Sequence, residues 1–160
     1  MRINEIKKLE YGFDRIFCIE PSKKCTQTLK KYNDKRIKII NAAFGNCNKA
    51  GKLYSSGELG ASMFTNNPNL SFEKIIIIRT SQWFIENIKE GDVVFVKLNC
   101  EGAECDIIDD LINSNEIIKI YSLLITFDVR DFIDLKHREI QIRKRLLETK
   151  LFNYCFCDDV

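Results

Sequence analysis

Acidic and polar residues follow directly after an apolar run in residues 97–104, KLNCEGAE. Glu101 and Glu104 are three residues apart at the start of an expected helix, where they could share one face. Gly102 between them permits close backbone approach or a left-handed dihedral angle. Acidic residues directly after a buried strand lie where ligands of parallel α/β sheets bind. They could equally be ordinary charges favoured at a helix N-terminus. Lys97 stands within the apolar run, so we expect it to be paired instead of solvent-exposed.

A second acidic residue, Glu20, ends the apolar segment RIFCI and precedes Pro21. A carboxylate at the end of a buried strand can accept two hydrogen bonds from a ribose diol. The alternative is a solvated carboxylate at a helix start, since Ser22 is a suitable N-cap. Position alone therefore makes Glu20 a candidate for nucleotide binding and leaves the second interpretation open.

The elements that carry these residues alternate between strand and helix. Continuously apolar strands of this kind predict an α/β domain with a mostly parallel sheet that is covered on both faces. In such sheets ligands bind at the carboxyl ends of the strands. We expect strands at residues 15–21, 36–44, 74–80, 93–99, 120–129 and 151–157, short strands at 52–55 and 61–64, and helices at 2–11, 22–32, 81–88, 101–112 and 135–149.

An ordered set of short motifs is similar to the FkbM family of S-adenosylmethionine-dependent methyltransferases. KLNCEGAE resembles the family's lysine–x–aspartate–x–glutamate–glycine–alanine–glutamate signature, and IFCIEPS resembles its second strand. NAAFG resembles the segment after its third strand, the motif at residues 60–62 resembles a glycine–serine loop, and ITFDVR resembles a later strand. The set covers residues 13–130 of a chain of 160, which we expect to form a single partial domain.

The resemblance implies a Rossmann-like methyltransferase fold, the cofactor S-adenosylmethionine, and O-methylation of a hydroxyl on a sugar, another glycan or a secondary metabolite. It places Glu20 at the cofactor ribose and Ala42 and Ala43 at the adenine. Glu101 and Asp128 become candidates for the proton acceptor or substrate-orienting group. Asn99 occupies the position of the family's aspartate at the reaction centre.

Three departures from the family pattern affect this interpretation. The family's opening strand and glycine-rich loop have no counterpart, so the sheet is expected to be incomplete at the N-terminus, and it is also short at the C-terminus. Asn99 replaces a charged residue. Asp128 and Arg130 stand where the family has glutamate and histidine, and an arginine stays protonated. We therefore expect weak cofactor binding. A degenerate binding or scaffold domain without catalysis, or a nucleotide-binding fold with another ligand, are the alternatives.

Composition excludes several other classes of function. Lysine plus arginine number 25 against 23 aspartates and glutamates, which gives no electrostatic footprint for nucleic acid or an anionic membrane. The seven cysteines lack CxxC spacing and the single histidine, His137, lies apart from them, so no metal site is expected. Scattered cysteines in odd number, without a signal peptide or a long apolar run, favour a cytoplasmic protein. Assembly into a homo-oligomer is left open.

Overall fold

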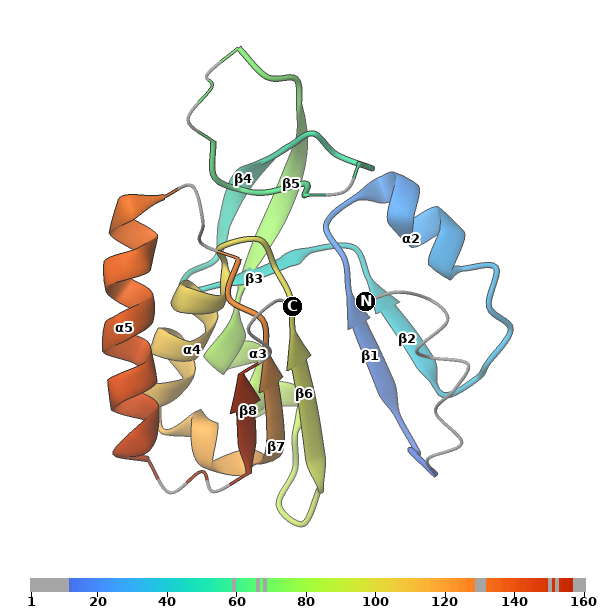
Figure 1. Ribbon diagram of the computed structural model, residues 1–160. Helices are drawn as coiled ribbons and strands as arrows, with labels where there is room; N and C mark the ends of the chain where they lie inside the picture. Colours follow the sequence, from blue (N-terminus) through green and yellow to red (C-terminus); the bar gives the residue numbers. More distant parts are fainter. Residues whose placement is uncertain are drawn as a thin grey trace.

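The computed structural model describes residues 12–58, 60–65, 67, 69–128, 132–149, 151 and 153–156. Strands and helices alternate along the chain, so the expected α/β class is confirmed (Figure 1). In order, the elements are β1 (Ile16–Ile19), α2 (Lys23–Leu29), β2 (Ile37–Ile40), β3 (Ala43–Gly45), β4 (Lys49–Tyr54), β5 (Phe72–Arg79), α3 (Thr80–Asn87), β6 (Val94–Leu98), α4 (Glu104–Asn113), the 3-10 helix η1 (Glu116–Lys119), β7 (Ile120–Ile125), α5 (Ile133–Leu147) and β8 (Tyr154–Phe156). The helix expected at residues 2–11 lies outside the described residues.

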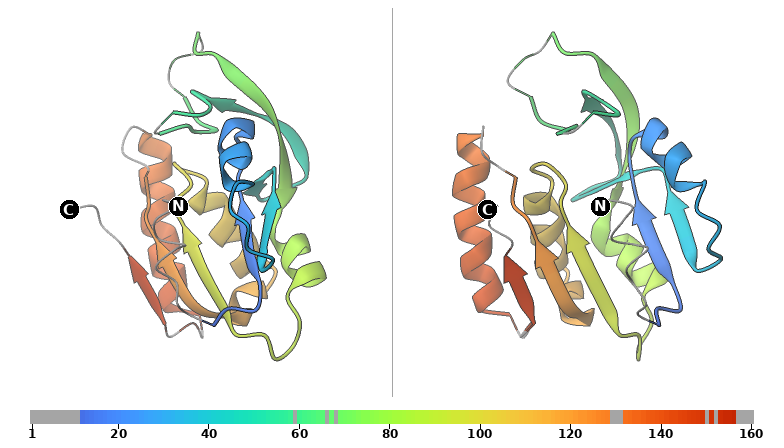
Figure 2. Two further views of the ribbon diagram at one scale, coloured as in Figure 1. Left: turned by 90° about the vertical axis from the view of Figure 1, so that its right-hand side faces the viewer. Right: turned by 45° about the vertical axis from the view of Figure 1, so that its right-hand side comes forward.

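The described strands form three small sheets in place of the single sheet that the sequence predicts. Their orders are β1-β2, β3-β5-β4 and β6-β7-β8. All pairs are parallel except β4 with β5, which is antiparallel. The sheets are therefore mixed, although β1, β2, β6, β7 and β8 all point in one direction (Figures 1 and 2).

The segment 36–44 is divided into two strands, which corrects the expectation of one. The Ala42 N–H donates to the Ile40 carbonyl at 3.0 Å, a tight turn directly after β2. The Asn41 side-chain amide donates to the carbonyls of Glu20 and Pro21 at 3.0 and 2.9 Å, which fixes this turn beside the end of β1. The chain then leaves β2 and pairs with β5 in the second sheet.

The main hydrophobic core lies between the sheet β6-β7-β8 and the helices α3, α4 and α5. Ile108 and Leu111 of α4 and Ile125 of β7 have no exposed surface, and α5 adds Leu146. Burial on this scale is what holds short helices in place, since their propensity alone is too weak. A second, smaller cluster joins Ala43, Leu53, Ile75 and Ile77 under the β3-β5-β4 sheet.

The opposite face of β6 and β7 carries exposed apolar residues. The expectation that both faces of the sheet are covered is therefore wrong for the described part of the chain. Phe95 and Tyr121 are 53% and 56% exposed, and their ring centroids lie 5.4 Å apart. Lys97 is also exposed on this strand, so the expectation that it is shielded from solvent is wrong, although Lys97 is not without an interaction partner.

Candidate functional site

Predicted site residues lie after the carboxyl ends of three strands. Glu20 directly follows β1, Asn99 directly follows β6, and Asp128 follows β7 by three positions, all at the carboxyl ends of strands that point the same way (Figure 1). The charges are close enough to influence one another. Burial raises the pKa of the Cys100 thiol to about 12, and the neighbouring charges of Glu104 and Glu20 contribute. Burial also raises the pKa of Glu104, with a smaller contribution from Asp128.

The turn after β6 has an unusual backbone. Glu101 and Gly102 adopt φ angles of 52° and 101°, both in the left-handed region. A Cβ atom at Gly102 would lie 2.9 Å from Leu135 Cδ1 and 3.1 Å from Phe64 Cδ2, so a larger residue would have to displace these side chains and would also strain the backbone. A non-glycine residue in this region is strained, and Glu101 must be held by its surroundings.

Glu104 holds this turn from inside the protein. Its side chain has no exposed surface. One carboxylate oxygen accepts the Cys100 N–H, and the other accepts the Gly102 N–H at 2.8 Å. These two hydrogen bonds offset part of the rise in pKa that burial causes. The expectation that Glu101 and Glu104 share a helix face is therefore wrong, because α4 begins only at Glu104 and Glu101 lies in the turn before it.

Ser62 supports the same turn from a distant part of the sequence. Its hydroxyl donates to the Glu101 carbonyl at 2.6 Å and accepts the Phe64 N–H at 3.0 Å. Ser62 also bridges to Tyr54 at the end of β4, so the segment between β4 and β5 is tied to the end of β6. The residues 60–62 that resemble a family loop thus contact the candidate site.

Glu20 is partly buried and is held by the start of α2. Its Oε1 accepts the Ser22 N–H at 2.8 Å. Burial raises the pKa of Glu20, and this hydrogen bond opposes the shift. Glu73 of β5 is close enough to raise the pKa further. The interpretation of Glu20 as a fully solvated carboxylate is therefore incomplete.

A hydrogen-bonded network of polar side chains beside Glu20 was not predicted from the sequence. The Ser56 Oγ lies 3.1 Å from the Ser22 Oγ and 2.5 Å from the Glu73 Oε2. Glu73 also receives the Lys23 N–H at 3.3 Å, so it caps the N-terminus of α2 from another sheet. These residues come from segments that are 17 to 50 positions apart, and no local pattern in the sequence could have indicated their contact.

The two alanines expected at an adenine are both buried, with Ala42 4% and Ala43 6% exposed. Ala43 begins β3 and packs in the small cluster with Ile75 and Ile77. Asn99, in contrast, is exposed at the edge. The structure therefore brings Glu20, Asn99, Glu101 and Asp128 to one edge, and places Ala43 in a neighbouring apolar core.

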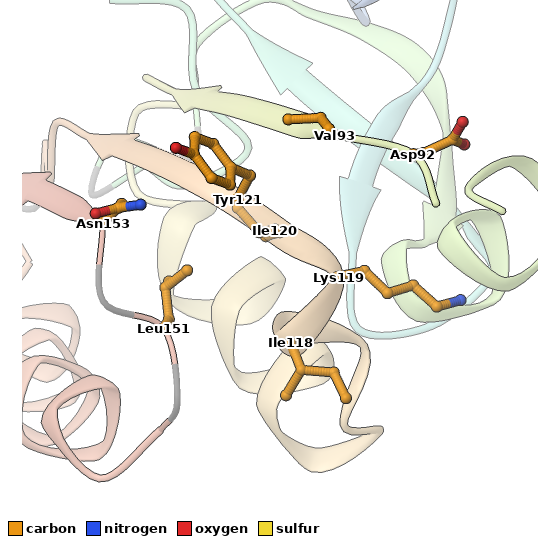
Figure 3. A pocket seen from close by; sticks show the side chains of 8 residues that line it. All are labelled: Asp92, Val93, Ile118, Lys119, Ile120, Tyr121, Leu151 and Asn153. Carbon is orange, nitrogen blue, oxygen red and sulfur yellow. The ribbon is translucent and has the colours of Figure 1, made fainter. Parts of the chain in front are cut away.

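A shallow depression of about 370 Å³ lies elsewhere, at the amino ends of β6 and β7 (Figure 3). It has a mixed polar and apolar lining: Asp92, Val93, Ile118, Lys119, Ile120, Tyr121, Leu151 and Asn153. None of the predicted site residues lines it. Because ligands of parallel α/β sheets bind at the carboxyl ends of strands, we do not assign the depression to the candidate site.

No protein-family model, no curated protein and no solved structure matches the chain. Among the described residues, no group of three or more histidine, cysteine, aspartate or glutamate side chains could hold a metal ion. A helix long and apolar enough to cross a membrane is likewise absent from the part of the chain that the structure describes.

Proposed function

We propose that this chain carries part of the site of an S-adenosylmethionine-dependent O-methyltransferase of the FkbM type. The acceptor would be a hydroxyl of a sugar or secondary metabolite. The observation that supports the proposal is that Glu20 and the turn at residues 99–104 follow the carboxyl ends of two strands that point the same way, and that the charges of Glu20 and Glu104 both act on Cys100.

The described residues fit one end of the cofactor. Glu20 follows a parallel strand, is partly buried and keeps a carboxylate beside the start of α2, as an acceptor for a ribose diol requires. Within the described residues, no strand pairs with both β1 and β6, so no glycine-rich loop after such a strand offers backbone donors to the methionine end. S-adenosylmethionine supplies an electrophilic methyl group, and the protein has to align the acceptor and take up its proton.

The residues around the turn after β6 would align the acceptor and take up its proton. Glu101 and Asp128 are the proposed carboxylates for accepting the hydroxyl proton, and the exposed Asn99 amide would orient the acceptor by hydrogen bonding. Glu104 and Ser62 act through the backbone, since their hydrogen bonds fix Glu101 in its left-handed conformation. They are positioning residues in this proposal.

A domain that binds a ligand or partner without catalysis is the second candidate. The neutral Asn99 after β6, and the lack of a strand paired with both β1 and β6 in the described chain, favour it. Such a domain would keep the fold and the polar residues after the carboxyl ends of β1, β6 and β7. It would not catalyse methyl transfer.

Nuclear magnetic resonance titration with S-adenosylhomocysteine tests the cofactor site that the proposal requires, because it detects weak binding. We expect fast-exchange shifts at residues around Glu20 and in the turn 99–104, with a Kd weaker than about 100 μM. Glu20→Gln should reduce these shifts, and Glu90→Gln, which changes an exposed carboxylate, should not. Shifts that are absent, or that are the same in Glu20→Gln, would contradict the proposal. One-to-one binding at micromolar Kd would show that the pocket is complete without a further loop.

A further inference from the structure

The strand β4 forms one edge of the β3-β5-β4 sheet. Among the described strands it pairs only with β5. At its end, Tyr54 and Ser62 form an isolated antiparallel bridge, in which each N–H donates to the other residue's carbonyl, at 2.8 and 3.3 Å. The chain then leads away from β4, since the ring of Phe64 packs against that of Phe132, with centroids 5.9 Å apart. The rest of the β4 edge has no strand beside it in the described chain.

The bridge shows which backbone groups of β4 face this open edge. Because Tyr54 exchanges both hydrogen bonds with Ser62, its N–H and carbonyl point away from β5. Backbone groups alternate in direction along an antiparallel strand, so those of Lys52 and Ala50 point the same way. The Ser55 N–H, in agreement, donates to a carbonyl just before β5 at 3.3 Å. Within the described residues, the backbone groups of Ala50 and Lys52 have no partner on the open side.

Two lysines lie directly opposite each other on the outward face of this hairpin. Lys52 of β4 pairs with Lys74 of β5, and both are exposed. Their pair is one without hydrogen bonds between the two backbones, which brings side chains closest, and like charges placed opposite each other are destabilising. The Lys52 ammonium lies 4.3 Å from the centre of the Phe72 ring. In the part of the chain that the structure describes, neither lysine forms an ion pair with a carboxylate.

An exposed apolar side chain lies beside the lysine pair on the same face. Ile76 of β5 is 63% exposed, and its partner on β4 is Ala50, which is also exposed. Because alanine is small, a side chain placed opposite Ala50 on the open edge can extend over it and contact Ile76. Residues two positions apart point to the same face of a strand, so this apolar position and Lys52 are presented together.

The charges of β4 restrict what can pair with its edge. Lysines on an edge strand protect it against indiscriminate pairing. The strand, KAGKLY, contains Lys49 and Lys52 and no acidic residue, so pairing with β4 of a second copy would bring four lysines together without a carboxylate. A segment that places a carboxylate opposite Lys52 instead gains an ion pair across the strands and offsets the repulsion from Lys74. Charge complementarity therefore selects an acidic partner.

We propose that the open edge of β4 binds an extended segment of another protein, in which an acidic residue precedes a branched apolar residue by two positions. The segment runs antiparallel to β4, as residue 62 does, so that its acidic side chain lies beside Lys52 and its apolar side chain reaches Ile76. Main-chain hydrogen bonds to Ala50 and Lys52 supply affinity, and the two side chains supply selectivity. The proposal is independent of methyl transfer, so either idea can fail alone.

The test follows the amide resonances of the full nitrogen-15-labelled chain during titration with the synthetic peptide GTETITVG. Saturable shifts are expected in residues 49–53. Replacing the glutamate of the peptide by lysine should weaken binding about threefold at low ionic strength. In the Lys52→Glu variant this preference should reverse. Lys38→Glu makes the same change of charge at an exposed lysine on the edge strand β2, and it should leave the preference as in the wild type.

Peptides with a single N-methyl group separate strand pairing from simple charge attraction. In the proposed register the N–H groups of the peptide's glutamate and isoleucine donate to β4, and the N–H of the threonine between them points away. N-methylation of the isoleucine should therefore weaken binding about fivefold, because it removes one of these donors. N-methylation of the threonine is the matched control and should leave the affinity unchanged.

Several results would overturn the proposal. Equal affinity of the two N-methylated peptides would mean that the backbone edge is not involved. No saturable shift with any peptide, in a spectrum that shows a folded chain, would mean that β4 does not accept a strand. A single-stranded oligonucleotide that shifts the same resonances and binds more tightly than the glutamate peptide would assign the lysines to nucleic acid. A dimer in light scattering that excludes the peptide would show that a second copy covers β4.

Discussion

The Ser62 hydroxyl donates a 2.6 Å hydrogen bond to the carbonyl oxygen of Glu101, 39 positions later in the sequence. It links the segment between β4 and β5 to the turn after β6, where Glu101 has a left-handed backbone. The conformation of a proposed site residue therefore depends on a hydroxyl from the segment between β4 and β5.

Ser62→Ala should lower the free energy of unfolding by about 1 kcal/mol, because the Glu101 carbonyl loses its partner. It should also reduce any shift that S-adenosylhomocysteine causes in residues 99–104. Urea denaturation measures the first effect. Ser71→Ala is the matched control, since Ser71 is exposed and only its backbone carbonyl forms a described hydrogen bond. Equal stability of the two variants would contradict the role of Ser62.

Glu104→Gln should destabilise the protein by about 1–3 kcal/mol. The carboxylate accepts two backbone N–H groups, from Cys100 and Gly102, and a buried amide can accept only one of them while its NH₂ group opposes the other. Thermal and urea unfolding check this prediction. The same substitution at the exposed Glu90 should change stability by less than about 0.5 kcal/mol.

The pH dependence of stability should have opposite signs at Glu20 and Asp34. Burial raises the pKa of Glu20 above its ordinary value of 4.5, so the folded protein binds more protons than the unfolded chain just above that pH. The stability of the wild type relative to Glu20→Gln should therefore fall as the pH rises through 4.5 and beyond, until Glu20 is ionised in the folded state.

Asp34 provides the internal comparison. Hydrogen bonds from Arg36 lower its pKa from 3.8 to about 2. The stability of the wild type relative to Asp34→Asn should therefore rise as the pH increases from about 2 to above 3.8. Urea denaturation at a series of pH values measures both differences. Slopes of the same sign would show that one of the two shifts has been assigned wrongly.

Cys100 should react slowly with iodoacetamide at pH 8, because the thiolate is the nucleophile and burial raises the pKa of this thiol to about 12. Cys47 is exposed in the segment between β3 and β4 and should react much faster. Mass spectrometry of digested protein gives the two rates, and labelling in urea should make them similar. Fast labelling of Cys100 in the folded protein would contradict the raised pKa of this partly buried thiol.

Most secondary structure could be predicted because its signals are local. Ser22 caps α2 as expected, with the Cys25 N–H donating to its hydroxyl. The apolar segments gave β1, β6 and β7, and the spacing of Ile107, Ile108 and Leu111 gave α4.

Sheet organisation could not be predicted from the same signals. The run KIIIIR reads as a strand buried on both faces, yet β5 pairs antiparallel with β4, and Ile76 is 63% exposed while Ile75 and Ile77 are buried. Position in a sheet depends on distant partners, which four consecutive isoleucines do not specify. The inward role of Glu104 was missed for a related reason, because a carboxylate at a helix start usually faces solvent.

The contacts that attach β1 to the rest of the protein also determine when this attachment can form. Arg15 bonds to Asn87 and Asp92, 72 and 77 positions later, and Phe17 packs on Trp83. During synthesis at about 5–20 residues per second, β1 would leave the ribosome roughly 4–15 s before these partners. A two-stranded unit is marginal alone, so β1 and β2 gain lasting order only late in translation. For those seconds the nascent apolar edge of β1 is accessible to chaperones.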